Sequence, residues 1–249
     1  MTKKKNKNQK LRVLVPTDFS GHALNAGIFT IELLKNTLGE LILENVFQVP
    51  KENTGTLISV NDIIIRESEE RLKKEQALLK LKKEKIEVTT QSEEGNPINA
   101  VKKAFKKTQA NMLVIGHNSK MDRFSSTFIS QPEYWPTLLV PGNTTNKISK
   151  EAIVISTSVS INDGIGVGPE FAEIEKRYRD SAHLLYFTKN STVEHLKATV
   201  EALLKKHKKI GMLIFNTIKG DRLEQAIKEH QLDSVFFSHP VFLLSNNGE

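Results

Sequence analysis

Short apolar runs alternate along the chain with segments in which apolar residues recur at helical spacing. The runs typical of buried strands are residues 12–16, 41–49, 86–92, 111–116 and 137–141. Helical spacing extends over residues 23–34, 61–85 and about 98–108, and Gly39 is placed to end the first of these helices. Strands that alternate with helices predict a parallel α/β sheet.

Two sequence blocks of the first half recur in the second. Ala77-Leu78-Leu79-Lys80 recurs at residues 202–205, and the run at 13–17 recurs at 153–157. Each Ala-Leu-Leu-Lys block is followed by a strand and by a Gly-Asn or Gly-Asp turn. Continuing this alignment predicts that residues 234–238 form the counterpart of the fourth strand of the first half.

The repeat predicts two tandem open parallel-sheet α/β domains of Rossmann-like type. The predicted parts are a disordered Lys-rich tail at 1–10, a first domain at 11–142, a polar linker at 143–150 and a second domain at 151–249. The tail holds five lysines and no acid, so most of the net charge of +7 belongs to it. We interpret it as a solvated tip. Contact with phosphates through counterion release is the alternative, and nucleic acid is not an expected partner.

Composition narrows the class of protein. With 38% hydrophobic and 26% charged residues, the chain has the balance of a globular protein. No uncharged apolar run approaches the ~18 residues that a membrane-spanning helix needs. The absence of cysteine excludes disulfides, thiolate metal sites and cysteine nucleophiles. We therefore expect a cytoplasmic protein without a membrane partner.

Five segments of the first half, taken in order, resemble the universal stress protein family. They are residues 13–20, 41–46, 94–97 with Ala100, 111–116 and 136–141. The resemblance spans nearly all of residues 11–142. In the second half it depends on the internal repeat, so that domain is expected to be degenerate. The family implies an adenine nucleotide alpha hydrolase-like fold, in which a five-stranded parallel sheet has helices on both faces and the protein is usually dimeric.

Many members of this family bind ATP, and the resemblance implies where. An acid after the first strand and the backbone at the end of the second strand hold the adenosine, which indicates Asp18 and Val46 here. A loop of the form G-x2-G-x9-G-[ST] wraps the phosphates, and Gly116 and Ser130 stand at its first and last positions. These four residues are the candidate site for ATP with magnesium.

Two departures from the family pattern weaken this candidate site. Ser119 and Ile129 occupy the second and third glycine positions of the loop, and their side chains would crowd a phosphate. Asp18 also has an alternative role as the N-cap of the following helix, for which Ser20 is equally suited. We therefore expect ATP binding to be lost or weakened.

The second half offers no nucleotide loop of the family type. Ser158 stands in the place of Asp18, and the segment at 118–133 of the first half has no counterpart in the alignment. The run Gly164-x-Gly166-x-Gly168 precedes a helix start, but it matches neither the dinucleotide nor the P-loop pattern and contains no lysine. A flexible turn is the favoured interpretation of this run.

Residue spacing supports neither a metal site nor catalysis. None of the seven histidines forms an i,i+4 pair or an H-E-x-x-H motif. The chain has no G-x-S-x-G turn, and no serine, histidine and acid can be assigned to one pocket. His117 is the only histidine beside the predicted site. We assign no catalytic residue, no metal ligand and no cofactor other than the candidate ATP.

These observations predict a non-enzymatic universal-stress-type protein that acts through interaction surfaces or a small ligand. The alternative is an ATP-binding switch in the first domain, with slow or no hydrolysis. A third class, an adenylating enzyme, would need a Ser-Gly-Gly-rich turn in place of Pro16-Thr17-Asp18-Phe19. The expected partners are an unidentified protein and the chain itself. The apolar segments at 137–141 and 241–245 are predicted to pair within one chain as a pseudo-dimer, and the alternative is a homodimer.

Overall fold

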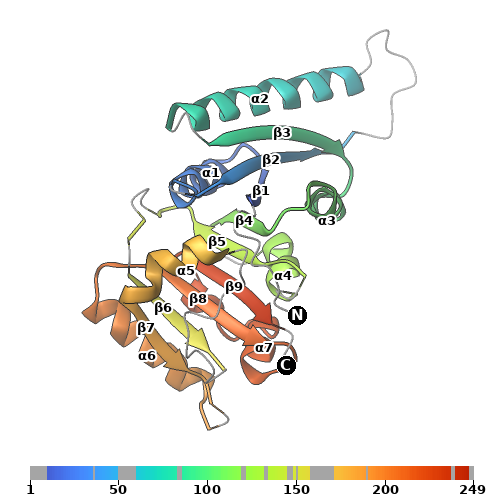
Figure 1. Ribbon diagram of the computed structural model, residues 1–249. Coiled ribbons are helices and arrows are strands. Elements are labelled where there is room, and N and C mark those ends of the chain that lie inside the picture. Colours follow the sequence, from blue (N-terminus) through green and yellow to red (C-terminus); the bar gives the residue numbers. More distant parts are fainter. Residues whose placement is uncertain are drawn as a thin grey trace, which may run out of the picture.

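One sheet runs through both halves of the chain in the computed structural model, and helices lie on both of its faces (Figure 1). The structure describes residues 10–35, 37–49, 60–82, 86–118, 122–131, 134–144, 148–149, 151–157, 171–188, 190–236 and 239–246. Ser119, Ser158, the predicted turn at 164–168 and all of the Lys-rich tail except Lys10 lie outside these residues.

The first half forms the elements that its apolar runs predict. Its strands are β1 (Leu11–Thr17), β2 (Gly39–Phe47), β3 (Glu87–Glu94), β4 (Met112–His117) and β5 (Thr137–Pro141). Its helices are α1 (Gly21–Leu33), α2 (Val60–Lys82), α3 (Pro97–Thr108) and α4 (Arg123–Ile129). The prediction that Gly39 ends α1 is wrong. Leu34 is the C-cap and is fully buried, so the chain turns earlier, and Gly39 begins β2.

The second half alternates strands with shorter helices. Its strands are β6 (Glu151–Ser156), β7 (Ala182–Tyr186), β8 (Ile210–Ile218) and β9 (Val241–Asn246). Its helices are α5 (Ala172–Tyr178), α6 (Val193–Lys206), α7 (Arg222–Lys228) and α8 (Asp233–Phe236), with a 3-10 turn η2 (Arg179–Ser181). Residues 233–236 are helical, so the strand predicted at 234–238 is wrong, and residues 237 and 238 lie outside the described part.

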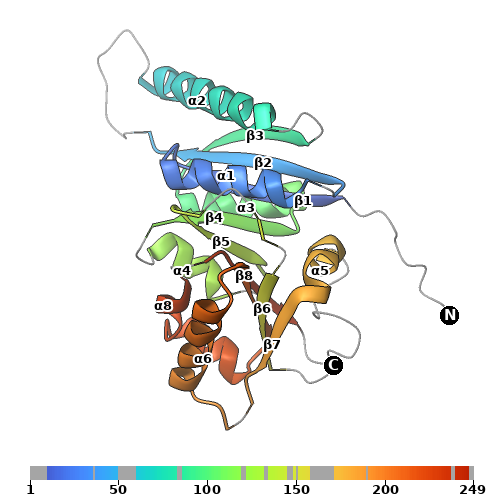
Figure 2. The same ribbon diagram turned by 90° about the vertical axis from the view of Figure 1, so that its left-hand side faces the viewer.

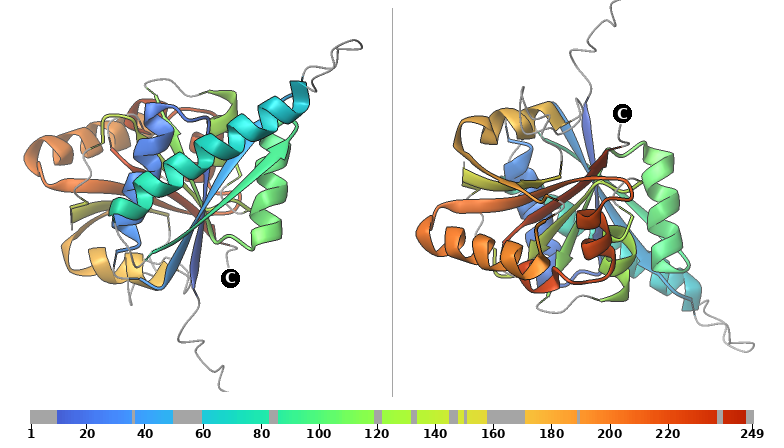
Figure 3. Two further views of the ribbon diagram at one scale, coloured as in Figure 1. Left: turned by 90° about the horizontal axis from the view of Figure 1, so that it is seen from above. Right: turned by 90° about the horizontal axis from the view of Figure 1, so that it is seen from below.

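The strand order is β3-β2-β1-β4-β5-β9-β8-β6-β7. Neighbouring strands are parallel within each half, and β5 and β9 are antiparallel where the halves meet. Thr137 lies opposite Leu243, and Leu139 lies opposite Val241. The two apolar segments that were expected to pair therefore do so within this chain. The views in Figure 3 show how far the joined sheet twists along its length.

Strand positions correct the alignment of the repeat. β8 lies between β6 and β9 in the way that β4 lies between β1 and β5, so β8 takes the place of β4 rather than that of β3. The helices α7 and α8 then follow β8 as α4 follows β4, and the prediction that 118–133 has no counterpart is wrong. The shared Ala-Leu-Leu-Lys block misled the alignment because it is a common helix pattern. Leu79 is fully buried in α2, whereas Leu204 in α6 is only half-buried.

Two apolar layers cover the two faces of the sheet, and each contains residues of both halves. Val13 of β1 and Val154 of β6 face the layer that includes α1, α2 and α5. Leu14 and Ile153, the neighbours of these residues, face the layer that includes α3, α4, α6, α7 and α8. This alternation, with both faces buried, is typical of parallel sheets. No helix in the described part of the chain has the length and apolar character that a membrane-spanning segment requires.

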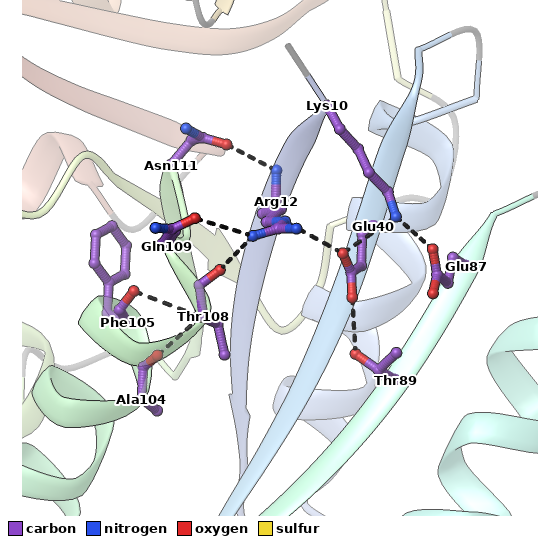
Figure 4. Close-up of polar contacts among 10 residues, drawn as sticks. All are labelled: Lys10, Arg12, Glu40, Glu87, Thr89, Ala104, Phe105, Thr108, Gln109 and Asn111. Carbon is purple, nitrogen blue, oxygen red and sulfur yellow. Dashed lines mark hydrogen bonds and ion pairs between the residues drawn. The ribbon is translucent and has the colours of Figure 1, made fainter.

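A polar network closes the amino-terminal edge of the first half (Figure 4). Lys10 forms ion pairs with Glu40 of β2 and Glu87 of β3, the first at 3.2 Å. Arg12 also pairs with Glu40, at 3.5 Å, and donates a hydrogen bond of 3.1 Å to the Thr108 carbonyl at the end of α3. Lys10 therefore belongs to the packed domain, which corrects its assignment to the disordered tail.

Candidate functional site

A cavity of about 250 Å³ lies where β1, β2 and β4 end at their carboxyl termini. The cavity lining includes the polar residues Asp18, His22, Glu44 and Asp122. Val46 and Gly116, which were predicted near ATP together with Asp18, also line it. Open α/β sheets bind ligands at the carboxyl ends of their strands. Three of the four predicted site residues, Asp18, Val46 and Gly116, thus lie around one cavity.

Ser130, the fourth predicted residue, does not line this cavity. It is the C-cap of α4, and its hydroxyl donates a hydrogen bond of 3.1 Å to the Thr127 carbonyl. Ile129, which occupies the third glycine position of the family loop, is fully buried in the core. The helix α4 therefore occupies the segment in which the resemblance implies a phosphate loop.

Gly116 is required here by close packing. A Cβ atom at this position would lie 2.1 Å from the carbonyl oxygen of His22 and 2.9 Å from the backbone nitrogen of Ala23. The first turn of α1 thus rests directly against the end of β4. This contact explains the glycine without any bound phosphate.

The turn between β1 and α1 holds Asp18 at the mouth of the cavity. The Ser20 backbone N–H donates a hydrogen bond of 2.9 Å to the Asp18 carboxylate. Ser20 is the N-cap, since its hydroxyl accepts a hydrogen bond from the Ala23 N–H, and this decides the capping role in favour of Ser20. Burial acts to raise the pKa of Asp18, but the hydrogen bonds from Ser20 outweigh it and hold that pKa below its usual value.

Glu44 is the unexpected member of the site. It lies on β2, lines the cavity, and is 1% exposed. Among the described residues, neither of its carboxylate oxygens has a partner at hydrogen-bond distance, although the amide nitrogen of Gln91, which is likewise buried and unpaired, lies close by. Burial raises the pKa of Glu44 to about 7, and the nearby Gln91 amide and the lysines 103 and 107 only partly oppose this rise. The sequence analysis did not predict Glu44, although an acid inside the apolar strand at residues 41–46 indicates a buried polar site.

A second buried acid, Glu75, anchors α2 to the same end of the sheet. It accepts a hydrogen bond of 2.9 Å from the Thr17 hydroxyl. Asn45 donates to the Thr17 carbonyl at 2.8 Å and accepts from the Ser68 hydroxyl at 2.6 Å. Burial raises the pKa of Glu75 despite the hydrogen bond from Thr17. Unlike Glu44, Glu75 has a protein partner for one of its carboxylate oxygens, while its other oxygen, Oε1, has none among the described residues.

His117 does not line the cavity that holds Asp18 and Glu44. It lies in a neighbouring hollow of about 510 Å³, together with Pro141 at the end of β5. Its ring nitrogen Nδ1 lies 2.6 Å from the Asn118 carbonyl, and burial lowers the pKa of His117. Its contacts are those of a histidine held in the core. The prediction that His117 is the histidine beside the site is wrong, because His22 of α1 lines the cavity instead.

Comparisons with known proteins agree with this architecture. Residues 11–129 match the family model described as "Universal stress protein family". Over 95% of this chain and 99% of the other, the fold is similar to that of a universal stress protein from Archaeoglobus fulgidus DSM 4304, with a TM-score of 0.65 and 13% identity. A putative universal stress protein from Pseudomonas aeruginosa UCBPP-PA14 aligns with 94% of this chain and 92% of its own, with a TM-score of 0.51 and 11% identity. No curated protein matches the sequence. At these identities the similar structures show the fold alone.

Proposed function

We propose that this chain, whose residues 11–129 match the universal stress protein family model, is a non-enzymatic stress-response protein whose first domain binds a small ligand between β1, β2 and β4. The observation that carries this proposal is Glu44, a buried carboxyl group that lines the cavity without a hydrogen-bond partner among the described residues. An unpaired buried polar group costs stability. A ligand that donates hydrogen bonds to Glu44 would remove this cost on binding.

The charge of the lining indicates the class of ligand. The cavity is lined by three carboxyl groups, those of Asp18, Glu44 and Asp122, and its lining includes neither lysine nor arginine. A triphosphate would bring several negative charges close to these carboxylates. The cavity volume of about 250 Å³ also lies below the roughly 300–1,000 Å³ common for ligand pockets. We therefore infer a small ligand with N–H donors, either neutral or cationic, such as an amidine or an amino-heterocycle.

Two of the three acids already have structural tasks, which supports a binding role without catalysis. The Asp18 carboxylate accepts the Ser20 N–H, and the Asp122 carboxylate caps α4 by accepting the Ser125 N–H at 2.7 Å. Both carboxylates are therefore held in place by turns. Glu44 remains to recognise a ligand.

The alternative proposal is an ATP-binding switch with slow or no hydrolysis. Asp18 and Val46 line the cavity as the resemblance implies for adenosine, and α1 begins beside it. The amino-terminal end of a helix attracts anions. A magnesium ion bound with the nucleotide would reduce the repulsion from the acidic lining.

The proposed setting is the cytoplasm, with an unidentified protein as a further partner. Because β9 covers the edge of β5, self-association into a homodimer would have to use another surface. Self-association is tested by measuring the molar mass of the purified protein across a concentration series.

Titration calorimetry separates the two ligand proposals. Adenine, 2-aminopyridine and benzamidine serve as probes with N–H donors, and ATP with Mg²⁺ serves as the competitor. We expect at least one donor probe to bind in the wild-type chain and to bind more weakly in Glu44→Leu, while Glu69→Gln, on an exposed face of α2, serves as the control. ATP is expected to bind no tighter than about 0.1 mM, equivalent to ~5.5 kcal/mol. Low-micromolar ATP binding that Asp18→Ala abolishes would favour the switch instead.

A further inference from the structure

Two histidines and one glutamate from three separate segments meet in the second half, away from the cavity. Glu151 is the first residue of β6, His183 lies near the beginning of β7, and His207 is the C-cap of α6. Each offers one ligand atom, and these atoms lie within 4.8 Å of one another. All three residues are half-buried. Figure 2 shows β6, β7 and α6 together at the end of the molecule far from α2.

We propose that Glu151, His183 and His207 bind a divalent transition-metal ion of the zinc class, with water as the fourth ligand. Two imidazoles and one carboxylate are a ligand set that zinc accepts in proteins. Bond lengths of about 2.0–2.2 Å place the ligand atoms of a tetrahedral site roughly 3.4 Å apart. The observed limit of 4.8 Å exceeds that spacing, so binding requires the three side chains to rotate toward one ion.

The three side chains are free for this role. Within the described residues, none of these side chains takes part in a hydrogen bond or ion pair; Glu151 is held through its backbone, whose N–H donates to the Ser149 hydroxyl at 3.2 Å and which pairs with Ile210 of β8. The imidazole rings of His183 and His207 lie with their centroids 4.2 Å apart and their planes inclined by 48°. Each ring has two nitrogens, either of which can bind a metal ion when it carries no proton.

Two groups of neighbouring charges affect cation binding at this site, one favourably and one unfavourably. α6 ends immediately before His207, and the carbonyl groups at the end of a helix carry partial negative charge that favours a cation. The lysines at 205, 206, 208 and 209 oppose a cation, but all four are exposed, so water and salt screen their charges. With three protein ligands and no thiolate, we expect binding in the micromolar range rather than the tight binding of a closed structural site.

A metal ion here would connect parts of the second half that are distant in sequence. Its ligands come from the beginnings of β6 and β7 and from the connection between α6 and β8. Among the described strands, β7 is the last in the sheet order, next to β6 alone. The ion would therefore fasten an edge strand to the adjacent strand and to a helix end, and it would raise the stability of the folded state by binding it selectively.

The test uses the full-length chain, first treated with a chelator and then titrated with Zn²⁺ in a calorimeter and with Co²⁺ in a visible spectrophotometer. The proposal expects one ion per chain, visible Co²⁺ bands with the intensity of a four-coordinate site, and a melting temperature that rises by several degrees with excess Zn²⁺. His183→Ala and His207→Ala should each weaken Zn²⁺ binding at least tenfold. His195→Ala, at an exposed position of α6, is the matched control and should bind as the wild type does.

Unchanged Zn²⁺ affinity in both ligand variants, or the absence of four-coordinate Co²⁺ bands in the wild type, overturns the proposal. If His183→Ala does not fold, Glu151→Gln provides a variant of similar size at the third ligand. The Co²⁺ spectrum of the wild-type chain decides independently of any substitution.

Discussion

Replacing Glu44 by glutamine should stabilise the ligand-free protein at pH 8 and have much less effect at pH 5. Burial raises the pKa of Glu44 from 4.5 to about 7. The folded chain therefore binds this proton more tightly than the unfolded chain does, and stability falls as the pH rises from about 4.5 to 7. Above pH 7 the folded protein carries the whole cost of a buried, ionised Glu44.

The size of this cost follows from the pKa. A rise from 4.5 to about 7 corresponds to a cost on the order of 3 kcal/mol once both states are ionised. The glutamine side chain does not ionise, so Glu44→Gln should recover this energy at pH 8. For a protein of this size, 3 kcal/mol amounts to roughly 6–12 °C in melting temperature.

The assay is a set of thermal melts of both proteins at pH 5, 6, 7 and 8 without ligand. The quantity to compare is the difference between Glu44→Gln and wild type at each pH, because buried His117 and half-buried His239 are present in both proteins and their effects cancel. The unpaired amide of the new glutamine changes the stability difference by the same amount at every pH. Glu69→Gln, at an exposed position of α2, should give no pH-dependent difference. A Glu44→Gln difference that stays constant or shrinks as the pH rises would refute the reasoning.

Three further predictions concern packing. Gly116→Ala should destabilise the fold by about 2–4 kcal/mol in urea unfolding, because its Cβ would lie 2.1 Å from the His22 carbonyl oxygen. Gly21→Ala, where a Cβ meets nothing within 4 Å, should be neutral, and an equally tolerant Gly116 would contradict the packing argument. Deleting residues 1–9 should leave the melting temperature unchanged, and also removing Lys10 should cost at most about 1 kcal/mol, because its ion pairs are solvent-exposed. Truncation after about residue 147 bares β5, so the first half alone should dimerise or aggregate, and a soluble monomer in size-exclusion chromatography at high concentration would count against it.

Most strands of the first half could be predicted from the sequence because buried parallel strands need continuous apolar runs; β3, which is largely polar, is the exception. β5 begins and ends at the predicted residues, and β1 and β4 differ from their predictions by one residue at each end. The pairing of β5 with β9 could also be predicted, since both segments are apolar and an unpaired apolar edge is unfavourable. The strand positions depend on the local hydrophobic pattern, and the pairing of β5 with β9 depends on covering one exposed strand edge.

The neighbours of each element and the composition of the sites required the tertiary structure. Like β3, β8 follows a helix and precedes a turn. In the sheet, however, β8 pairs with β9, and which strand it joins depends on how the chain crosses over the sheet. Glu44 could be seen in the sequence as an acid in an apolar strand, but its lack of a partner is a property of the packed cavity. Glu151, His183 and His207 are far apart in the sequence and meet only because β6, β7 and the end of α6 are packed together. Hydrophobic periodicity is read over a few residues, whereas burial and proximity are set by contacts across the whole chain. The sequence alone therefore determined most strands of the first half, and the tertiary structure decided the helix at residues 233–236, the strand neighbours and the sites.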